Sequence, residues 1–185
     1  MTPPGPGDPA GTGDPPGTGD PPGTGDPPGT GDPAGQSRVI RPARDGEADA
    51  LRDVVHAAYA HYVARIGKPP GPMLDDYAAR IADGQAWVLE DAGRIAGILV
   101  LEEQDGRFLL DNIAVRPECQ GSGHGRTLMA FAEAEARRRG FMEVVLYTHA
   151  LMTENQALYR RLGYVETGRV TEKGFDRVYM QFNLT

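Results

Sequence analysis

The alternation of apolar and polar positions becomes regular only after Arg38. The short apolar segment "RVI" is a candidate strand. Apolar residues then recur at helical spacing from Leu51 to Ala58, and this pattern predicts a helix that ends at Gly67. After the break "KPPGP", the segment "MLDDYAARIADG" predicts a second, short helix that ends at Gly84.

Three segments rich in Val, Ile and Leu follow: "AWVLE", "RIAGILVLE" and "RFLLDNIAV". Turns that contain Asp or Gly separate them, so they predict consecutive antiparallel strands. The later segment "RTLMAFAEAEARRRG" predicts a helix, because Leu128, Phe131 and Ala132 share one face and Gly140 can end it.

The C-terminal part continues this mixture, with "EVVLYT" as a strand, "TENQALYRRLG" as a helix, and "YVETGRV" and "RVYMQFNL" as two final strands. Thr153 and Gln156 have the spacing of a capping box at the start of that helix. The helix between Gly123 and Arg139 joins two strands as a crossover, so those strands should be parallel. Residues 38–185 are therefore predicted to form one α/β domain, a mixed and mostly antiparallel sheet flanked by about four helices.

Residues 1–37 have a different composition, built from the hexapeptides "GDPAGT", "GDPPGT" and "GDPAGQ" between Gly7 and Gln36. A collagen helix needs Gly at every third residue, and this spacing excludes it. Pro removes backbone donors and no apolar residue is available for burial, so the expectation is a disordered, acidic tail. We favour a dispensable extension, or upstream sequence included by a wrong start site, over a spacer or docking arm.

Charge, apolar run length and cysteine content limit the partners and the compartment that the sequence predicts. The net charge is −7, and five Asp with no Lys or Arg lie in residues 1–37, which leaves about −2 for the rest. A nearly neutral domain argues against nucleic acid as the main partner. No apolar run is long enough to span a bilayer, no secretory signal precedes the domain, and Cys119 is the only cysteine. Cytoplasmic residence is the expectation.

The stretch "QGSGHGRT", Gln120 to Thr127, predicts an anion site. Backbone N–H groups of successive glycines before a helix form a concavity that suits phosphate, and Arg126 adds a charged donor. A P-loop would have Lys where Arg126 stands and a wider glycine spacing. A dinucleotide fold would place its third Gly one residue after Gly125, in the turn after the first strand of a parallel sheet. The sequence therefore predicts a phosphate site that is neither a P-loop nor a dinucleotide-binding turn.

The stretch "NIAVRPECQGSGHGRTLM", followed after a helix and a strand by "TENQALYRRLGYVETG", resembles the GNAT (GCN5-related N-acetyltransferase) superfamily. The resemblance covers about residues 39–184. It implies a sheet that splays between the strand ending at Val115 and the strand around Val144 to Thr148, with acetyl-CoA in the wedge. The predicted phosphate would then be that of coenzyme A.

The resemblance also implies roles for individual residues. Backbone groups of Ile113, Ala114 and Val115 would bond the acetyl carbonyl and the pantetheine arm, and Asn155 would bond the same arm. The backbone of the glycine loop would hold the pyrophosphate. This loop comprises Gln120, Gly121, Ser122, Gly123, His124, Gly125 and Arg126. Tyr159 would lie near the thioester sulfur.

The chemistry of acyl transfer agrees with these residue types. An amine attacks a thioester, so the Val115 N–H can stabilise the oxyanion and the Tyr159 hydroxyl can protonate the leaving thiolate. Asn155 and Tyr159 are four residues apart on one helix face, which favours a shared site over separate packing roles. Asp111 is the candidate base; Glu102, Glu103 and a water chain are alternatives.

The sequence leaves the acceptor open. Asp75, Asp76 and Tyr77 could attract a cationic amine, whereas Arg65 and Lys68 could hold a carboxylate. We expect a small-molecule amine, because the sequence pattern does not indicate an extended acidic groove for a basic peptide. The alternatives are a protein N-terminal or lysine acetyltransferase, another acyl-CoA, a non-catalytic acyl-CoA-binding module, or a scaffold whose repeat tail binds a partner.

No metal is expected, because direct transfer needs none. His56 and His61 are five residues apart and do not share a helix face well, and Cys119 has no adjacent base in the sequence. We expect structural or acceptor-lining roles for them. A homodimer is possible on the family resemblance alone.

Overall fold

The computed structural model of the protein describes residues 38–184, so the predicted tail over residues 1–37 lies outside the described residues. The helices and strands are β1 (Val39–Pro42), α1 (Ala48–Ile66), a 3-10 turn (Gly71–Leu74), α2 (Tyr77–Ala82), β2 (Ala86–Asp91), β3 (Arg94–Gln104), β4 (Arg107–Val115), a 3-10 turn (Pro117–Cys119), α3 (His124–Arg138), β5 (Glu143–His149), α4 (Thr153–Arg161), β6 (Val165–Glu172) and β7 (Phe175–Asn183).

The strands form one seven-stranded sheet in the order β1-β2-β3-β4-β5-β7-β6. Every neighbouring pair is antiparallel except β4 and β5, which α3 connects as a crossover. The predicted mixed α/β sheet with one parallel pair is therefore confirmed. No helix within residues 38–184 is both long enough and apolar enough to cross a membrane.

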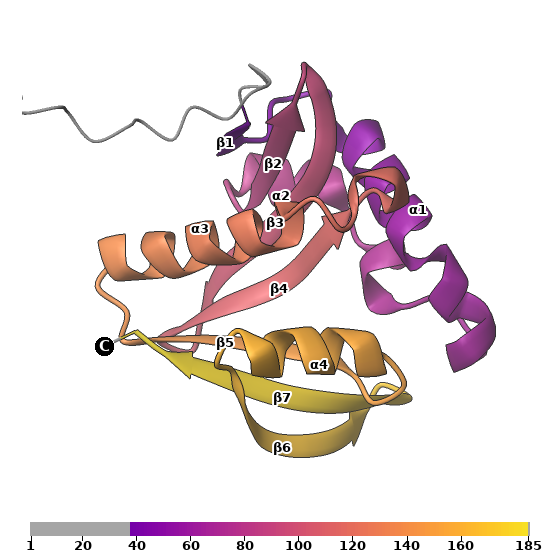
Figure 1. Ribbon diagram of the computed structural model, residues 1–185, viewed down its shortest axis with the longest axis vertical. Coiled ribbons are helices and arrows are strands. Elements are labelled where there is room, and N and C mark those ends of the chain that lie inside the picture. The colour runs from indigo at the N-terminus through magenta and orange to yellow at the C-terminus, as the bar shows by residue number, and fades with distance from the viewer. Residues whose placement is uncertain (1–37, 185) are drawn as a thin grey trace, which may run out of the picture. The chain divides into compact units, whose positions relative to one another are not determined.

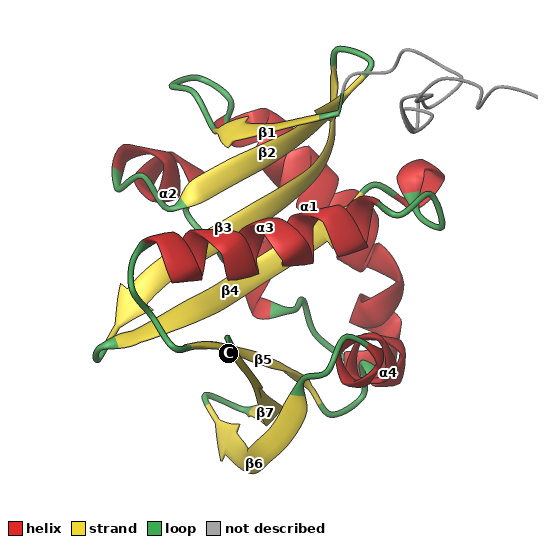
Figure 2. Cartoon of the chain, turned by 60° about the vertical axis from the view of Figure 1, so that its left-hand side comes forward, coloured by secondary structure: helices red, strands yellow, loops and turns green. Residues whose placement is uncertain are grey.

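Two hydrophobic cores cover the two faces of the sheet (Figures 1 and 2). On one face, α1 and α2 pack through residues such as Leu51 and Tyr77 against Ile98 of β3. On the other face, α3 packs through Leu128 and Ala132, as its predicted apolar stripe requires. Tyr159 of α4 belongs to this second core. The central strands are buried on both faces, which explains their nearly continuous apolar sequence.

The sheet opens into a wedge between β4 and β5. These strands pair only from Phe108 to Leu110 with Val144 to Leu146, and then diverge (Figure 1). The change begins where the register of β3 with β4 shifts, between Val100 and Leu101, so Asp111 stands opposite no residue of β3. The predicted splay is therefore confirmed, and the second half of β4 has one edge that no strand covers.

Two local predictions were wrong. The second helix does not run from Met73 to Gly84; α2 begins at Tyr77, because the Asp76 side chain accepts hydrogen bonds from Ala78 N and Ala79 N and so caps it there. The capping box at α4 does not form either. The helix begins at Thr153 without a side-chain cap, and Gln156 instead donates to the carbonyls of His149 and Ala150.

Candidate active site

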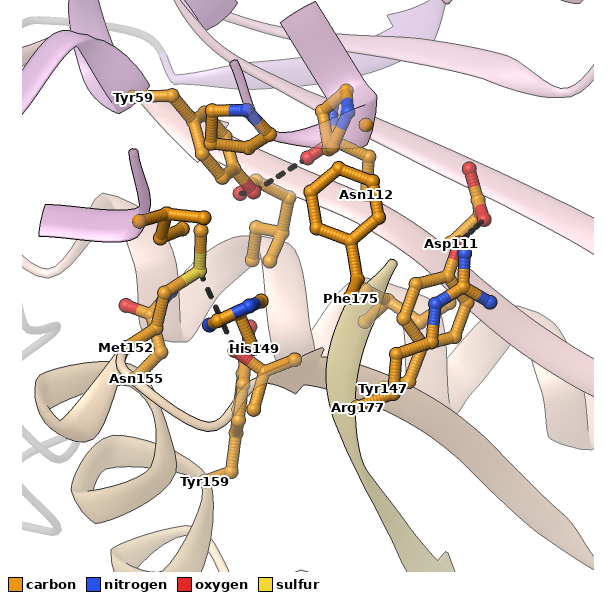
Figure 3. Close-up of a pocket in the computed structure, with 17 residues that line it drawn as sticks. Tyr59, Asp111, Asn112, Tyr147, His149, Met152, Asn155, Tyr159, Phe175 and Arg177 are labelled. Atoms are coloured by element: carbon orange, nitrogen blue, oxygen red, sulfur yellow. Dashed lines mark hydrogen bonds between the residues drawn. The ribbon is translucent and has the colours of Figure 1, made fainter. Parts of the chain in front are cut away.

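A cleft with an empty volume of about 630 Å³, its open mouth included, lies at the wedge. Its walls come from α1, the 3-10 turn at Gly71–Leu74, β4, β5, α4 and β7 (Figure 3). The lining residues are Tyr59, Ile66, Pro70, Gly71, Pro72, Leu110, Asp111, Asn112, Ile113, Tyr147, Thr148, His149, Met152, Asn155, Tyr159, Phe175 and Arg177. The structure thus brings the predicted Asp111, Ile113, Asn155 and Tyr159 together.

The open edge of β4 presents backbone groups to the wedge. Arg116 N donates to Ala96 O on β3, so alternation along the strand turns the N–H and C=O of Ala114 toward β3 as well. Ala114 exchanges these bonds with Ile98. The N–H groups of Ile113 and Val115 face the opposite, uncovered edge. These two residues, and not Ala114, offer backbone donors to a ligand.

Two side chains already contact the carbonyls on that edge. Tyr59 OH lies 3.2 Å from Ile113 O and 2.8 Å from Asn112 Oδ1, and Gln120 Nε2 donates to Val115 O at 3.0 Å. Asn112 is buried and donates in turn to Tyr77 OH. This network fixes the position of the β4 edge and leaves its N–H groups free of partners within residues 38–184.

The glycine loop lies beside the end of β4 and presents a run of free donors. Gln120 N donates to Pro117 O, but the N–H groups from Gly121 to Arg126 have no hydrogen-bond partner among residues 38–184. Gly121 and Gly123 have φ of +81° and +85°, which glycine adopts without strain. The space around the missing side chains of Gly121, Gly123 and Gly125 is open. The loop therefore has the donors and the access that a phosphate needs.

His124 contributes to this loop through its backbone. Its side chain is buried and its Nε2 lies 2.6 Å from Asp91 Oδ2 at the end of β2, on the interior side of α3. This hydrogen bond, helped by nearby Arg38, holds the pKa of Asp91 below its usual range. The His124–Asp91 contact anchors the first turn of α3 to the sheet and so orients the donors of the loop.

Asn155 and Tyr159 of α4 face the cleft from the side opposite β4 (Figure 3). Asn155 Oδ1 lies 3.4 Å from Tyr62 OH of α1, and its Nδ2 lies 3.7 Å from Met152 Sδ. The Tyr159 side chain is buried, and the hydroxyl has no hydrogen-bond partner within the described chain. Burial raises the pKa of Tyr159, so its hydroxyl stays protonated and can donate.

Both oxygens of Asp111 have partners. Tyr147 OH donates to Oδ1 at 2.6 Å, and Arg80 Nη2 of α2 donates to Oδ2 at 3.1 Å. Arg80 also pairs with Asp75 and Glu102, so it joins three carboxylates from three segments. A carboxylate oxygen can accept a second hydrogen bond, so Asp111 retains the capacity to accept another donor from the cleft.

Sequence reasoning missed three residues on the β5–β7 wall: Tyr147, His149 and Arg177. Tyr147 and His149 point to the face of β5 opposite the one that carries buried Val144 and Leu146. The two-residue period of the strand could therefore have predicted that they share the face that borders the cleft. Arg177 lies opposite His149 in the register of β7 with β5, a pairing that no local signal predicts. Leu151 N donates to His149 Nδ1 and burial lowers the pKa of His149, so the neutral ring carries its proton on Nε2.

Most of the other candidates have structural partners outside the cleft. Glu103 pairs with Arg139, and Arg65 pairs with Glu154. Lys68 donates to Gly174 O and lies over the Phe175 ring at the cleft mouth. The remaining candidates do not line the cleft: Asp75, Asp76, Tyr77, Glu102, His56, His61 and Cys119. Among residues 38–184, no cluster of three His, Cys, Asp or Glu side chains could hold a metal ion.

The described residues thus combine a splayed mixed sheet, unpaired backbone donors on β4 and an open glycine loop. The chain matches the model of the Acetyltransferase (GNAT) domain family over residues 82–166. Residues 82–166 therefore belong to an Acetyltransferase (GNAT) domain, as the motifs of the sequence implied.

The sequence relatives and solved structures agree. The chain is 30% identical over 144 residues to a mycothiol acetyltransferase of Cellulomonas flavigena, covering 70% of this chain and 40% of that protein. Its fold resembles the PaiA N-acetyltransferase of Thermoplasma acidophilum in complex with coenzyme A, with a TM-score of 0.67, 18% identity, and coverage of 80% of this chain and 99% of that one. YncA of Salmonella typhimurium, with acetyl-CoA, has a TM-score of 0.61 and 24% identity, over 80% of this chain and 95% of that one.

The chain spans about two fifths of the length of the curated relatives it matches. At 18% and 24% identity, the structural neighbours establish the fold of the domain. They leave its acceptor to be inferred from the chain's own residues.

Proposed function

We propose that the protein transfers the acetyl group of acetyl-CoA to a primary amine of a small molecule, by direct attack in a ternary complex. The observation that carries this proposal is the presence of two sets of free backbone donors within the described chain, at Ile113 and Val115 on β4 and from Gly121 to Arg126 in the loop. Two proteins of similar fold were solved with coenzyme A or acetyl-CoA, which supports the same donor for this chain.

The residues present fit such a donor. The N–H groups from Gly121 to Arg126 would bind the pyrophosphate, with the positive end of the α3 dipole behind them. The free N–H groups of Ile113 and Val115 would bind the pantetheine arm and the acetyl carbonyl, and Asn155 would bond the arm from α4. The bound thioester supplies the activated acetyl group.

The reaction forms one C–N bond and breaks one C–S bond. The amine nitrogen attacks the thioester carbonyl, and the oxyanion that forms is stabilised by the Val115 N–H. When the C–S bond breaks, the Tyr159 hydroxyl gives its proton to the departing sulfur. The proton lost by the amine passes to Asp111, which Tyr147 and Arg80 hold at the cleft wall. Proton exchange with solvent then returns Asp111 to its carboxylate and Tyr159 to its hydroxyl, so neither a metal nor a covalent enzyme intermediate is required.

The shape of the cleft supports a small acceptor. The C-terminal half of α1 and the turn at Gly71–Leu74 close one side, and the hairpin of β6 and β7 bounds the other. Lys68 joins these two sides at the mouth through Gly174 O. A protein chain would have to pass this contact, whereas a compact amine fits between the walls.

The first test is calorimetric titration of the full chain with acetyl-CoA, coenzyme A and NAD. Binding of acetyl-CoA and coenzyme A without NAD binding is expected, followed by release of coenzyme A when a panel of small amines is added. Acetyl-CoA binding without release of coenzyme A from any amine would indicate a non-catalytic acyl-CoA-binding module. Release only with lysine-containing peptides or protein N-termini would replace the small-molecule acceptor by a protein.

A further inference from the structure

We propose that the acceptor is an α-amino acid with an apolar side chain, whose carboxylate binds Arg177 while its amino group faces Asp111. This proposal rests on the proposed N-acetyltransferase activity and specifies the substrate class of the same cleft. It depends on the one cation and the one anion among the residues that line the cleft.

Arg177 is available to an anionic ligand. Its guanidinium carbon lies 4.1 Å from the centre of the Tyr147 ring, so the ring supports its flat face inside the cleft (Figure 3). Within the described chain its only ion-pair partner is Glu172, which one nitrogen, Nη1, engages. The Arg177 side chain is 21% exposed and the Glu172 side chain 37% exposed, so water reaches this pair and screens part of its attraction. The other N–H groups of Arg177 remain for a ligand.

Asp111 is held at the other end of the same ring. Tyr147 OH donates to Asp111 Oδ1, while Arg177 lies over the face of the Tyr147 ring. One tyrosine thus separates a fixed carboxylate from a fixed guanidinium. An α-amino acid carries an ammonium and a carboxylate on one carbon, and it matches this close pair of opposite charges.

The other cations near the cleft do not compete for this role. Arg80 has its nitrogens engaged by Asp75, Gln85, Glu102 and Asp111. Lys68, which the sequence offered as a carboxylate ligand, donates to Gly174 O, lies over the Phe175 ring and is not among the residues that line the cleft. Among these cations, Arg177 is therefore the one that lines the cleft and has only one nitrogen engaged by a protein group.

The rest of the lining selects the side chain of the acceptor. Apolar side chains that line the same cleft as Arg177 include Ile66, Pro70, Pro72, Met152 and Phe175. A charged acceptor side chain would lose hydration there without gaining a partner, whereas an apolar one buries its surface.

The test compares three acceptors of each side chain: the free amino acid, its amide and the corresponding decarboxylated amine. Phenylalanine, leucine and methionine provide three such sets. Release of coenzyme A is measured with the wild-type chain, Arg177→Met and Arg177→Lys. Arg169→Met is the matched control, because Arg169 lies on β6, pairs with Glu166 and does not line the cleft. Calorimetric binding of each amino acid to the coenzyme A complex gives a readout without turnover.

We expect the free acid to have the highest kcat/KM. Arg177→Met should raise the KM for the acid at least about tenfold, the contribution of a charge-assisted hydrogen bond, and should leave the decarboxylated amine unchanged. Arg177→Lys should retain part of the preference, and Arg169→Met all of it. Thermal unfolding of each variant checks that it is folded.

Equal kcat/KM for acid, amide and amine would overturn the carboxylate assignment while the acetyltransferase activity stands. The converse outcome is no turnover by any amine, with amino acids binding in a manner that Arg177→Met abolishes. That result would refute the proposed function and support the Arg177 subsite. Absence of both turnover and binding would refute both.

Discussion

The Tyr147 hydroxyl donates a 2.6 Å hydrogen bond to Asp111 across the wedge between β5 and β4. These strands pair only before this point, so the contact joins the two halves of the sheet where their backbones separate. Burial, together with the charge of Asp111, raises the pKa of Tyr147, so its hydroxyl keeps the proton that it donates. Tyr147 therefore orients the carboxylate that we propose as the base.

Replacement of Tyr147 by Phe should lower kcat about tenfold or more and leave acetyl-CoA affinity unchanged, because Asp111 would lose its orientation but not its charge. Tyr179→Phe is the matched control. Tyr179 is paired with Tyr147 across β5 and β7, and its hydroxyl donates to Glu172, the partner of Arg177, and not to Asp111. Steady-state kinetics and calorimetry check both variants; a Tyr179→Phe loss equal to that of Tyr147→Phe would contradict the assignment.

Tyr159→Phe should reduce kcat by about a hundredfold, the typical contribution of a positioned general acid, without changing acetyl-CoA binding. Tyr164→Phe is the control, because Tyr164 packs against Tyr159 with ring centres 6.1 Å apart but does not line the cleft. The measurement is single-turnover release of coenzyme A. An unchanged rate in Tyr159→Phe would remove the hydroxyl from the mechanism.

Two glycines of the loop allow its fold and its ligand contact to be separated. Gly123→Ala should destabilise the protein by about 1–2 kcal/mol, because φ is +85° at this position. Gly125→Ala introduces no such strain, so it should leave thermal stability unchanged or slightly higher while its methyl group weakens acetyl-CoA binding. Thermal unfolding and calorimetry of both variants test this contrast. Undiminished acetyl-CoA affinity in Gly125→Ala would count against phosphate at this loop.

Gly97 of β3 lets the sheet approach α3 closely. A Cβ there would lie 3.0 Å from Ala114 O and 3.0 Å from Leu128 Cδ1, so Gly97→Ala should cost about 1–3 kcal/mol of folding free energy. Gly168→Ala, on the exposed strand β6 with open space around it, should change stability by less than about 1 kcal/mol. Urea unfolding measures both, and equal losses would show that crowding at Gly97 is not the cause.

Glu135 should make stability depend on acidic pH. Hydrogen bonds from Arg138 and then Arg139 lower its folded pKa from 4.5 to about 2. Its contribution is therefore complete above about pH 4.5 and is lost as the pH falls toward 2. Glu135→Gln should lower the Tm at pH 7, and the difference from wild type should shrink below pH 4. Glu118→Gln, at an exposed position, should show no such trend; a pH-independent difference at Glu135 would contradict the ion-pair explanation.

Local pattern was enough for the elements of this domain, apart from the start of α2 and the cap of α4. The periodicity of apolar residues placed the helices and strands, and the crossover through α3 predicted the parallel pair of β4 and β5. The spacing of the glycines from Gly121 to Gly125 marked the loop, because backbone conformation there depends on the residues of the loop itself. Asn155 and Tyr159 could be paired because one helical turn separates them.

Long-range packing decided the rest. Alternation on β4 removed Ala114 from the candidate donors, since only the pairing with β3 shows which edge is open. Arg80 and Arg177 reach the cleft from α2 and β7, and no sequence spacing relates either one to Asp111 or Tyr147. The sequence offered both cationic and anionic side chains that could bind the acceptor, and it did not favour either kind. Only the folded chain placed Arg65 and Lys68 outside the residues that line the cleft, with partners in Glu154 and Gly174 O, and brought Arg177 into that lining.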